Sequence, residues 1–174
     1  MRLTRISPCL WFDSQAEDAA RYYCSIFENS RIRAVSRYGD AGRAVHGRPA
    51  GSVLTVDFEL AGQGFTALNG GPVFEFTPAI SLQVSCETQQ EIDQYWDRLT
   101  AGGDSSAQQC GWLKDRYGLS WQVVPVALAK LMTDPDIRKS DRVMTALLQM
   151  KKLDIAALQR AADGKNPLEN PTKT

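Results

Sequence analysis

The sequence has no excess of charge of either sign and no long hydrophobic run. Twenty basic and twenty acidic side chains among 174 residues cancel to a formal net charge of zero. This balance argues against an extended nucleic-acid-binding surface, which needs a local basic excess. No apolar stretch approaches the roughly 20 residues of a membrane-spanning helix, and the first residues lack the apolar stretch and cleavage site of a signal peptide. We therefore expect a cytoplasmic protein without nucleic-acid or membrane partners.

Cysteine is also sparse. The four cysteines form no CxxC pair, and they are Cys9, Cys24, Cys86 and Cys110. Their low density is typical of a protein in a reducing compartment. A nucleophilic thiol needs a base or a cation beside it to lower its pKa. The simpler interpretation is that these residues are small hydrophobes in the core.

The single histidine, His46, lies in a glycine-rich segment at residues 39–51 that has no periodicity. Arg43 and Arg48 flank it. We interpret these three residues as a flap that meets an anionic ligand or supplies a base when the segment closes. An exposed loop without a catalytic role is the simpler alternative.

A repeated pattern of a strand followed by a capped helix is the most informative feature. Residues 6–12 are predicted to form a strand, and residues 14–17 (SQAE) have the form of a capping box before a helix. The pattern returns at residues 79–86 and 88–91 (TQQE). Further strands are predicted at residues 31–38, 52–60, 65–69, 110–113 and 119–126. The pattern indicates an α+β fold of paired βαβββ modules around a shared cleft.

The modules, at about residues 6–71 and 79–126, together make up a predicted region 1–126. Residues 127–163 are expected to form a C-terminal helical extension, with Asp134-Pro135 and Asp154 as helix starts. Its apolar stripe is interpreted as a packing surface. Residues 164–174 are expected to be a polar tail.

Several separated motifs point to one known family. They are residues 11–13 (WFD), 22–23 (YY), 26–30 (IFENS), 67–72 (ALNGGP), 83–86 (QVSC), 95–96 (YW) and 110–125 (CGWLKDRYGLSWQVVP). Together they resemble the PhnB-like branch of the vicinal oxygen chelate superfamily, the glyoxalase and bleomycin-resistance group. Members of this branch often carry the name demethylubiquinone methyltransferase-like. The resemblance implies paired βαβββ modules, a ligand cleft in each curved sheet, and a homodimer.

The resemblance also implies a divalent metal, which many superfamily enzymes hold with His and Glu side chains from the outer strands of each module. In this sequence residues 6–12, 65–71, 79–86 and 119–126 contain no His, Asp or Glu. We therefore predict no catalytic metal at that position and no other cofactor. Gly62 and Gly64 lie between two predicted strands, which does not match a glycine-rich turn for a methyl donor.

Aromatic and amide side chains on or beside the predicted strands are the candidates for a ligand cleft. Apolar walls with a few amide anchors are typical of small-molecule sites, although rings in these positions also suit a core. The candidates are Trp11, Phe12, Asn69, Gln83, Trp112, Trp121 and Gln122.

Three hypotheses follow from these observations. The leading one is a metal-free protein that binds a small, partly aromatic molecule without converting it. The second is an enzyme that works without a metal, either a lyase or isomerase or the methyltransferase that the family name suggests. The third is a regulatory or scaffold dimer that uses the C-terminal helices. Loss of turnover on changing Gln122 or Asn69 favours an enzyme, and ligand depletion without product favours a binder.

Overall fold

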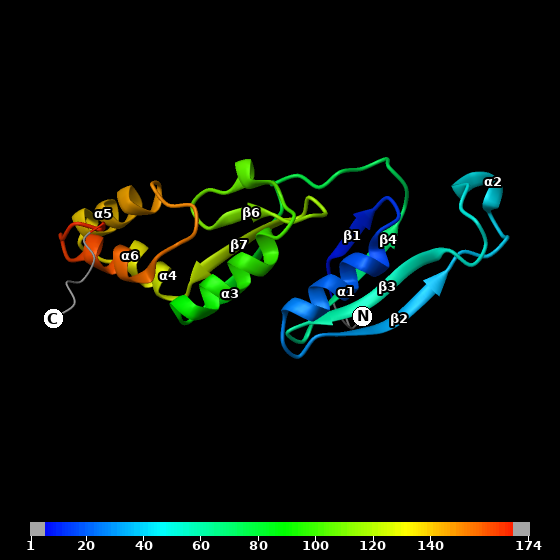
Figure 1. The fold of residues 1–174 in the computed structure, drawn as a ribbon, viewed down its shortest axis with the longest axis horizontal. Coiled ribbons are helices and arrows are strands. Elements are labelled where there is room, and N and C mark those ends of the chain that lie inside the picture. The colour runs from blue at the N-terminus through cyan, green and yellow to red at the C-terminus, as the bar shows by residue number, and fades with distance from the viewer. Residues whose placement is uncertain (1–5, 169–174) are drawn as a thin grey trace, which may run out of the picture. The chain divides into compact units, whose positions relative to one another are not determined.

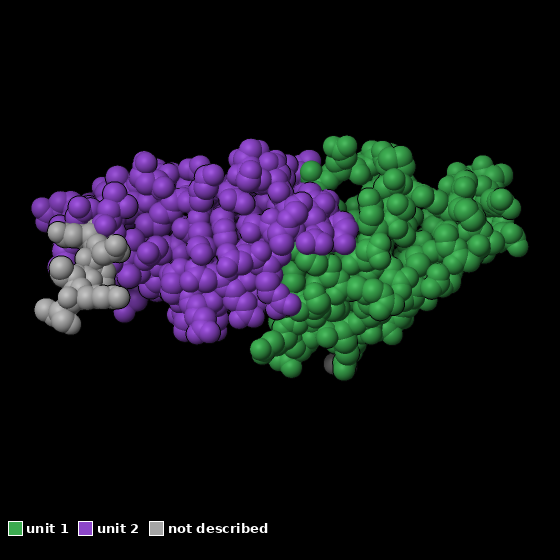
Figure 2. Space-filling view, viewed as in Figure 1, with its two compact units in different colours: residues 1–76 green, residues 77–174 purple. Residues whose placement is uncertain are grey.

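Two separate β-sheets organise the chain, one in each half (Figure 1). The structure, a computed structural model, describes residues 6–168. It divides into unit 1, residues 1–76, and unit 2, residues 77–174 (Figure 2). The predicted fold class is confirmed: the protein is α+β, with a β-α-β unit in each half and helices at the C-terminal end.

Unit 1 is a βαβββ module with a four-stranded sheet in the order β1-β4-β3-β2. Strand β1 is parallel to β4, and the other neighbours are antiparallel. A short helix interrupts the connection between β2 and β3. The elements are β1 (Cys9–Phe12), α1 (Ala16–Ile26), β2 (Arg31–Arg37), α2 (Arg43–His46), β3 (Val53–Leu60) and β4 (Gln63–Asn69).

Helix α1 covers one face of this sheet. Side chains alternate between the two faces of a strand, so Val56, Phe58 and Leu60 of β3 all lie buried on the α1 side. The Tyr23 ring from α1 stacks on Phe58 with centroids 6.4 Å apart, and Phe58 stacks on Phe65 at 5.4 Å. These rings form the core of unit 1.

The predicted capping box at residues 14–17 is wrong. The residue before α1 is Gln15, and no side chain near it in sequence caps the helix. The Asn69 side chain at the end of β4 takes this role, because its Oδ1 accepts the backbone N–H of Ala16 at 2.8 Å and its Nδ2 donates to the Val53 carbonyl at 3.1 Å. Glu17 pairs instead with Arg21 on the next turn.

Unit 2 begins with the same order of strand and helix but has a three-stranded sheet, β5-β7-β6. The capping box at residues 88–91 is confirmed: Thr88 Oγ1 accepts the Glu91 N–H at 3.2 Å, and the Glu91 carboxylate accepts the Thr88 N–H at 3.1 Å. The elements are β5 (Leu82–Cys86), α3 (Gln89–Thr100), the 3-10 helix η1 (Ser105–Ala107), β6 (Trp112–Lys114) and β7 (Ser120–Pro125).

Three C-terminal helices, α4 (Ala127–Met132), α5 (Ile137–Leu147) and α6 (Ile155–Ala162), share a core with β7. This core contains Val124, Leu131, Val143, Leu153, Leu158 and Ala162. Asp154 caps α6 as predicted, whereas α5 begins after Asp136 rather than at Asp134-Pro135. No helix within residues 6–168 is long and apolar enough to cross a membrane.

The finding that Asn69, and not Ser14, caps α1 can be tested by substitution. We expect Asn69→Ala to lower the free energy of unfolding by about 1–3 kcal/mol, because it removes a helix cap and leaves a buried N–H unpaired. Ser14→Ala, at the position that the sequence pattern favoured, is expected to change it by less than about 0.5 kcal/mol. Urea denaturation of both variants measures the difference. Equal effects would mean that Asn69 does not hold the helix.

Candidate functional site

Three of the predicted ligand residues form one row across the sheet of unit 2. Gln83 of β5 is the register partner of Gln122 of β7, and Gln122 is the partner of Trp112 of β6. Directly opposed residues on neighbouring strands project from the same face. The two amides and the indole therefore share the face of the sheet that is opposite α3.

A pocket of about 430 Å³ opens beside this row, between the sheet and α4. Its walls are mostly aliphatic and carry no charged side chain. The lining residues are Gln83, Ser85, Gln122, Val124, Pro125, Val126, Leu128, Ala129 and Met132. This volume is within the usual range for small-molecule sites, and an apolar wall with few polar anchors is their usual composition.

The two amides, together with the Ser85 hydroxyl, supply the polar side chains of this pocket. Gln122 is half-buried, and its Nε2 donates to the Ser81 hydroxyl at 2.8 Å. Gln83 is exposed on the neighbouring strand. An amide offers both a donor and an acceptor, so the pair can bind carbonyl, hydroxyl or amide groups of a ligand. Neither amide supplies the charge or the nucleophile that bond cleavage needs.

Trp121 lies on the other face of the sheet, since it is adjacent to Gln122 in β7. It is 2% exposed, and its Nε1 donates to the Asp115 carboxylate at 2.8 Å. Asp115 is equally buried and also accepts the backbone N–H groups of Tyr117 and Leu119. These contacts place Trp121 in the core, away from Gln83, Gln122 and the pocket.

The three candidates of unit 1 are held by contacts inside that unit. The Trp11 Nε1 donates to the Gly71 carbonyl at 2.8 Å, and its ring lies edge-on to Phe74 at 4.9 Å. Phe12 is buried and packs against Phe76 at 5.2 Å. The Asn69 amide is engaged at both ends, as described above. Trp11 faces away from α1, and Phe12 and Asn69 face toward it.

The flap candidates lie together at the end of the sheet of unit 1. Arg48 pairs with Asp13, donating to its carboxylate at 2.8 Å and to its carbonyl at 2.6 Å. The His46 Nδ1 accepts the Arg48 N–H at 3.0 Å, and its Nε2 lies 3.2 Å from the Ala41 carbonyl. Both ring nitrogens therefore serve the fold of this segment, and His46 needs the segment to open before it can act as a base. Arg43 begins α2 and is exposed.

Metal donors do not converge in the part of the chain that the structure describes. Within residues 6–168 no three His, Cys, Asp or Glu side chains are placed to hold an ion. The Gln83–Gln122 row offers neutral amides, which bind a divalent cation poorly without a carboxylate or imidazole. The residues present do not fit a superfamily-type metal centre.

Cys9 and Cys86, the two cysteines on the strands of the predicted clefts, are poor nucleophiles at neutral pH. Burial, and the nearby Glu91 carboxylate, raise the pKa of Cys86 to about 11. Burial is also the main cause that raises the pKa of Cys9, with the Asp57 charge as a second cause. No cation lowers either value, so neither thiol has the environment of a reactive cysteine.

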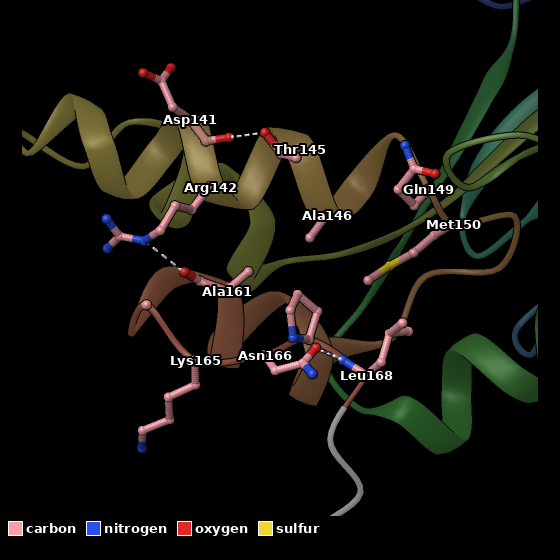
Figure 3. Close-up of a pocket in the computed structure, with 12 residues that line it drawn as sticks. Asp141, Arg142, Thr145, Ala146, Gln149, Met150, Ala161, Lys165, Asn166 and Leu168 are labelled. Carbon is pink, nitrogen blue, oxygen red and sulfur yellow. Dashed lines mark hydrogen bonds between the residues drawn. The ribbon is translucent and has the colours of Figure 1, made fainter.

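A second cavity, of about 490 Å³, lies between α5, α6 and residues 164–168 (Figure 3). Ala146, Ala161 and Met150 are among its lining residues, and Arg142 binds the end of α6 through the Ala161 and Ala162 carbonyls. The sequence pattern gave no sign of this cavity, because it depends on the chain reversal after α6. Part of the predicted tail lines it, and residues 169–174 of that tail lie outside the described residues.

The fold and the pocket together define a class: α+β proteins built on β-α-β units, with a small apolar pocket on the open face of a sheet. The chain belongs to the family described as 3-demethylubiquinone-9 3-methyltransferase, whose model matches residues 4–124. This places it in the PhnB-like group that the motifs indicated. No curated protein is significantly similar to the chain.

Solved structures agree with this assignment. A PhnB protein from Bacillus cereus, whose name includes 3-demethylubiquinone-9 3-methyltransferase, is 35% identical, with a TM-score of 0.61. The match covers 71% of this chain and all of that one. The protein PA1353 from Pseudomonas aeruginosa shares the fold at 18% identity, with a TM-score of 0.54 and coverage of 71% and 98%.

The buried carboxylate of Asp115 yields a stability prediction. Asp115→Asn replaces one acceptor oxygen with an amide donor that faces either Trp121 Nε1 or two backbone N–H groups. We expect the free energy of unfolding to fall by about 2–3 kcal/mol, since hydrogen bonds to a charged acceptor are lost inside the core. Urea denaturation checks this, with the exposed Asp141→Asn as the matched control. Equal stability of the two variants would contradict this role for Asp115.

The raised pKa of Cys86 predicts slow alkylation. At pH 8 a thiol with a pKa of about 11 has about a hundredth of the thiolate of a thiol with the ordinary pKa of 9.0. We expect iodoacetamide to modify Cys86 in native protein at least about a hundredfold more slowly than in protein unfolded in urea. Mass spectrometry of the modified peptides measures both rates. Similar alkylation rates in native and unfolded protein would show that the Cys86 thiol is not buried and that its pKa is not raised.

Proposed function

We propose that this protein binds a small organic molecule, with an aromatic or similarly flat apolar body, in the pocket beside Gln83 and Gln122. The observation that carries the proposal is the convergence of two amides, adjacent in register, on one aliphatic pocket of about 430 Å³. Trp112 is the register partner of Gln122 and belongs to the same row, which places an aromatic side chain next to the amides on that face of the sheet. The amides then orient the ligand through its carbonyl or hydroxyl groups.

Binding without chemistry is favoured over catalysis at this pocket. Its lining side chains include no acid or base, so the Ser85 hydroxyl has no lining base to activate it, and general acid–base catalysis needs a titratable group near the reacting atoms. We infer that the protein binds its ligand without a metal ion. We also propose that it forms a homodimer, as the resemblance to the family implies. Native mass spectrometry reports the subunit number, any bound ion and any retained molecule together.

Methyl transfer, which the family description and the Bacillus cereus relative's name suggest, has no matching donor site among residues 6–168. A dinucleotide-type or S-adenosylmethionine-type site uses a glycine-rich turn from a strand into a helix. Here Gly62, with Ala61, forms the two-residue hairpin between β3 and β4, both at positive φ. Gly71 leads into a segment without a helix. We therefore do not propose this reaction.

A neutral aromatic amide tests the pocket. We expect 4-propylbenzamide to bind the wild-type protein in isothermal titration calorimetry, and Gln122→Leu to weaken it about tenfold, the usual effect of one lost hydrogen bond in a site. Gln90→Leu, an exposed glutamine on α3, is the matched control and is expected to bind as the wild type does. Equal affinity for all three proteins would overturn the assignment of Gln122 as an anchor.

A further inference from the structure

The cavity between α5, α6 and residues 164–168 lies in a part of the chain that the family model does not match. That model ends at residue 124, and every lining residue of this cavity lies between residues 141 and 168 (Figure 3). The cavity volume of about 490 Å³ is within the usual range of small-molecule sites. Its walls are mostly apolar, and no lining side chain is aromatic. The cavity is therefore a candidate binding site that is separate from the pocket beside Gln83 and Gln122.

Two alanines make room for this cavity between the helices. Ala146 of α5 and Ala161 of α6 both line it, and both are buried, at 7% and 3% exposed. The Met150 side chain reaches into the space after the end of α5, whereas Asp141 points away from it (Figure 3). A methionine side chain is flexible and adapts to the shape of what it contacts. The inner surface is thus suited to an apolar molecule rather than to an ion.

The third wall of the cavity, residues 164–168, is held in place by hydrogen bonds. Gly164 has a φ of +73°, which turns the chain back after α6. The Arg160 guanidinium then donates to the Pro167 carbonyl, at 2.7 Å from Nη2 and 3.3 Å from Nε. A wall that is ordered before a ligand arrives loses little conformational entropy on binding.

Leu168 completes this wall with an apolar side chain that the described residues leave 90% exposed. The six residues that follow it, ENPTKT, include one proline and no other apolar side chain. They therefore supply little apolar surface to cover Leu168. An apolar molecule in the cavity contacts Leu168 and removes part of its surface from water, which favours binding.

We propose that this cavity binds an unbranched alkyl chain of a small aliphatic molecule. The proposal does not depend on the pocket beside Gln122. The lining follows α5 and the turn after it from Arg142 to Met150, a length of about 12 Å at about 1.5 Å per residue. Three covalent steps of an extended chain span about 3.8 Å, so an alkyl chain of about eight carbons, about 9 Å long, fits within this length.

NMR of protein labelled with [13C-methyl]methionine, with 1-octanol as the probe, tests this site. Met150 lines the cavity and Met132 lines the pocket beside Gln122, so two methyl signals report on the two sites separately. We expect 1-octanol to shift the Met150 signal in a saturable manner and to leave the Met132 signal unchanged. The variants Met150→Leu and Met132→Leu assign the two signals.

Filling the cavity is expected to block the probe. Ala146→Leu places a larger apolar side chain in the space, and we expect it to weaken 1-octanol binding at least about tenfold. Ala129→Leu, on the wall of the other pocket, is the matched control and is expected to keep the wild-type affinity. Arg160→Met removes the hydrogen bonds to Pro167 without filling the core, and it is expected to weaken binding in the same direction.

Three results would overturn the proposal. The first is a Met150 signal that does not move up to the solubility limit of 1-octanol, or that moves at the same concentrations as the Met132 signal. The second is unchanged affinity for 1-octanol in both Ala146→Leu and Arg160→Met. The third is movement of the Met150 and Met144 signals with protein concentration and not with 1-octanol, which would assign the cavity to a second copy of the chain. The response of Met132 to 4-propylbenzamide tests the other pocket independently.

Discussion

The candidate site depends on the register between β6 and β7, and the buried carboxylate of Asp115 fixes that register. One carboxylate oxygen accepts two backbone N–H groups of the turn, and the other accepts the Trp121 indole. With Trp121 held on the α3 face, Gln122 must project from the opposite face, toward Gln83 and Trp112. A slip of one residue would exchange the two faces of β7 and place an indole where the amide now lies.

A comparable constraint operates in unit 1, where Asn69 joins three elements. Its side chain links the end of β4 to the first turn of α1 and to the start of β3. The Asn69 side-chain amide, which made this residue a ligand candidate in the sequence, therefore stabilises the fold of unit 1. A buried polar side chain whose hydrogen bonds are all made to neighbouring residues has a structural role. A buried polar side chain without hydrogen bonds lacks a partner, such as a water or a ligand. The Asn69 amide is hydrogen-bonded through both its oxygen and its nitrogen.

The contrast between the units explains why the site is assigned to unit 2. In unit 1 the Trp11 indole N–H, both His46 nitrogens and the Arg48 guanidinium are engaged by neighbouring groups of the same unit. In unit 2 the sheet face opposite α3 carries the Gln83 and Gln122 amides beside an apolar pocket. Gln122 donates one hydrogen bond to Ser81, and an amide with one donated bond retains an acceptor and a second donor hydrogen for a ligand.

The sequence by itself determined the order of strands and helices, the local cap formed by Thr88 and Glu91, and the presence of amides and aromatic rings on the central strands. These features depend on the alternation of side chains and on hydrogen bonds between residues three or four apart. Only the tertiary structure decided that Asn69 rather than Ser14 caps α1, and that Trp121 turns into the core while Gln122 turns outward. The reason is physical: each of these outcomes depends on the register between strands and on contacts between residues distant in the chain, which local pattern does not encode.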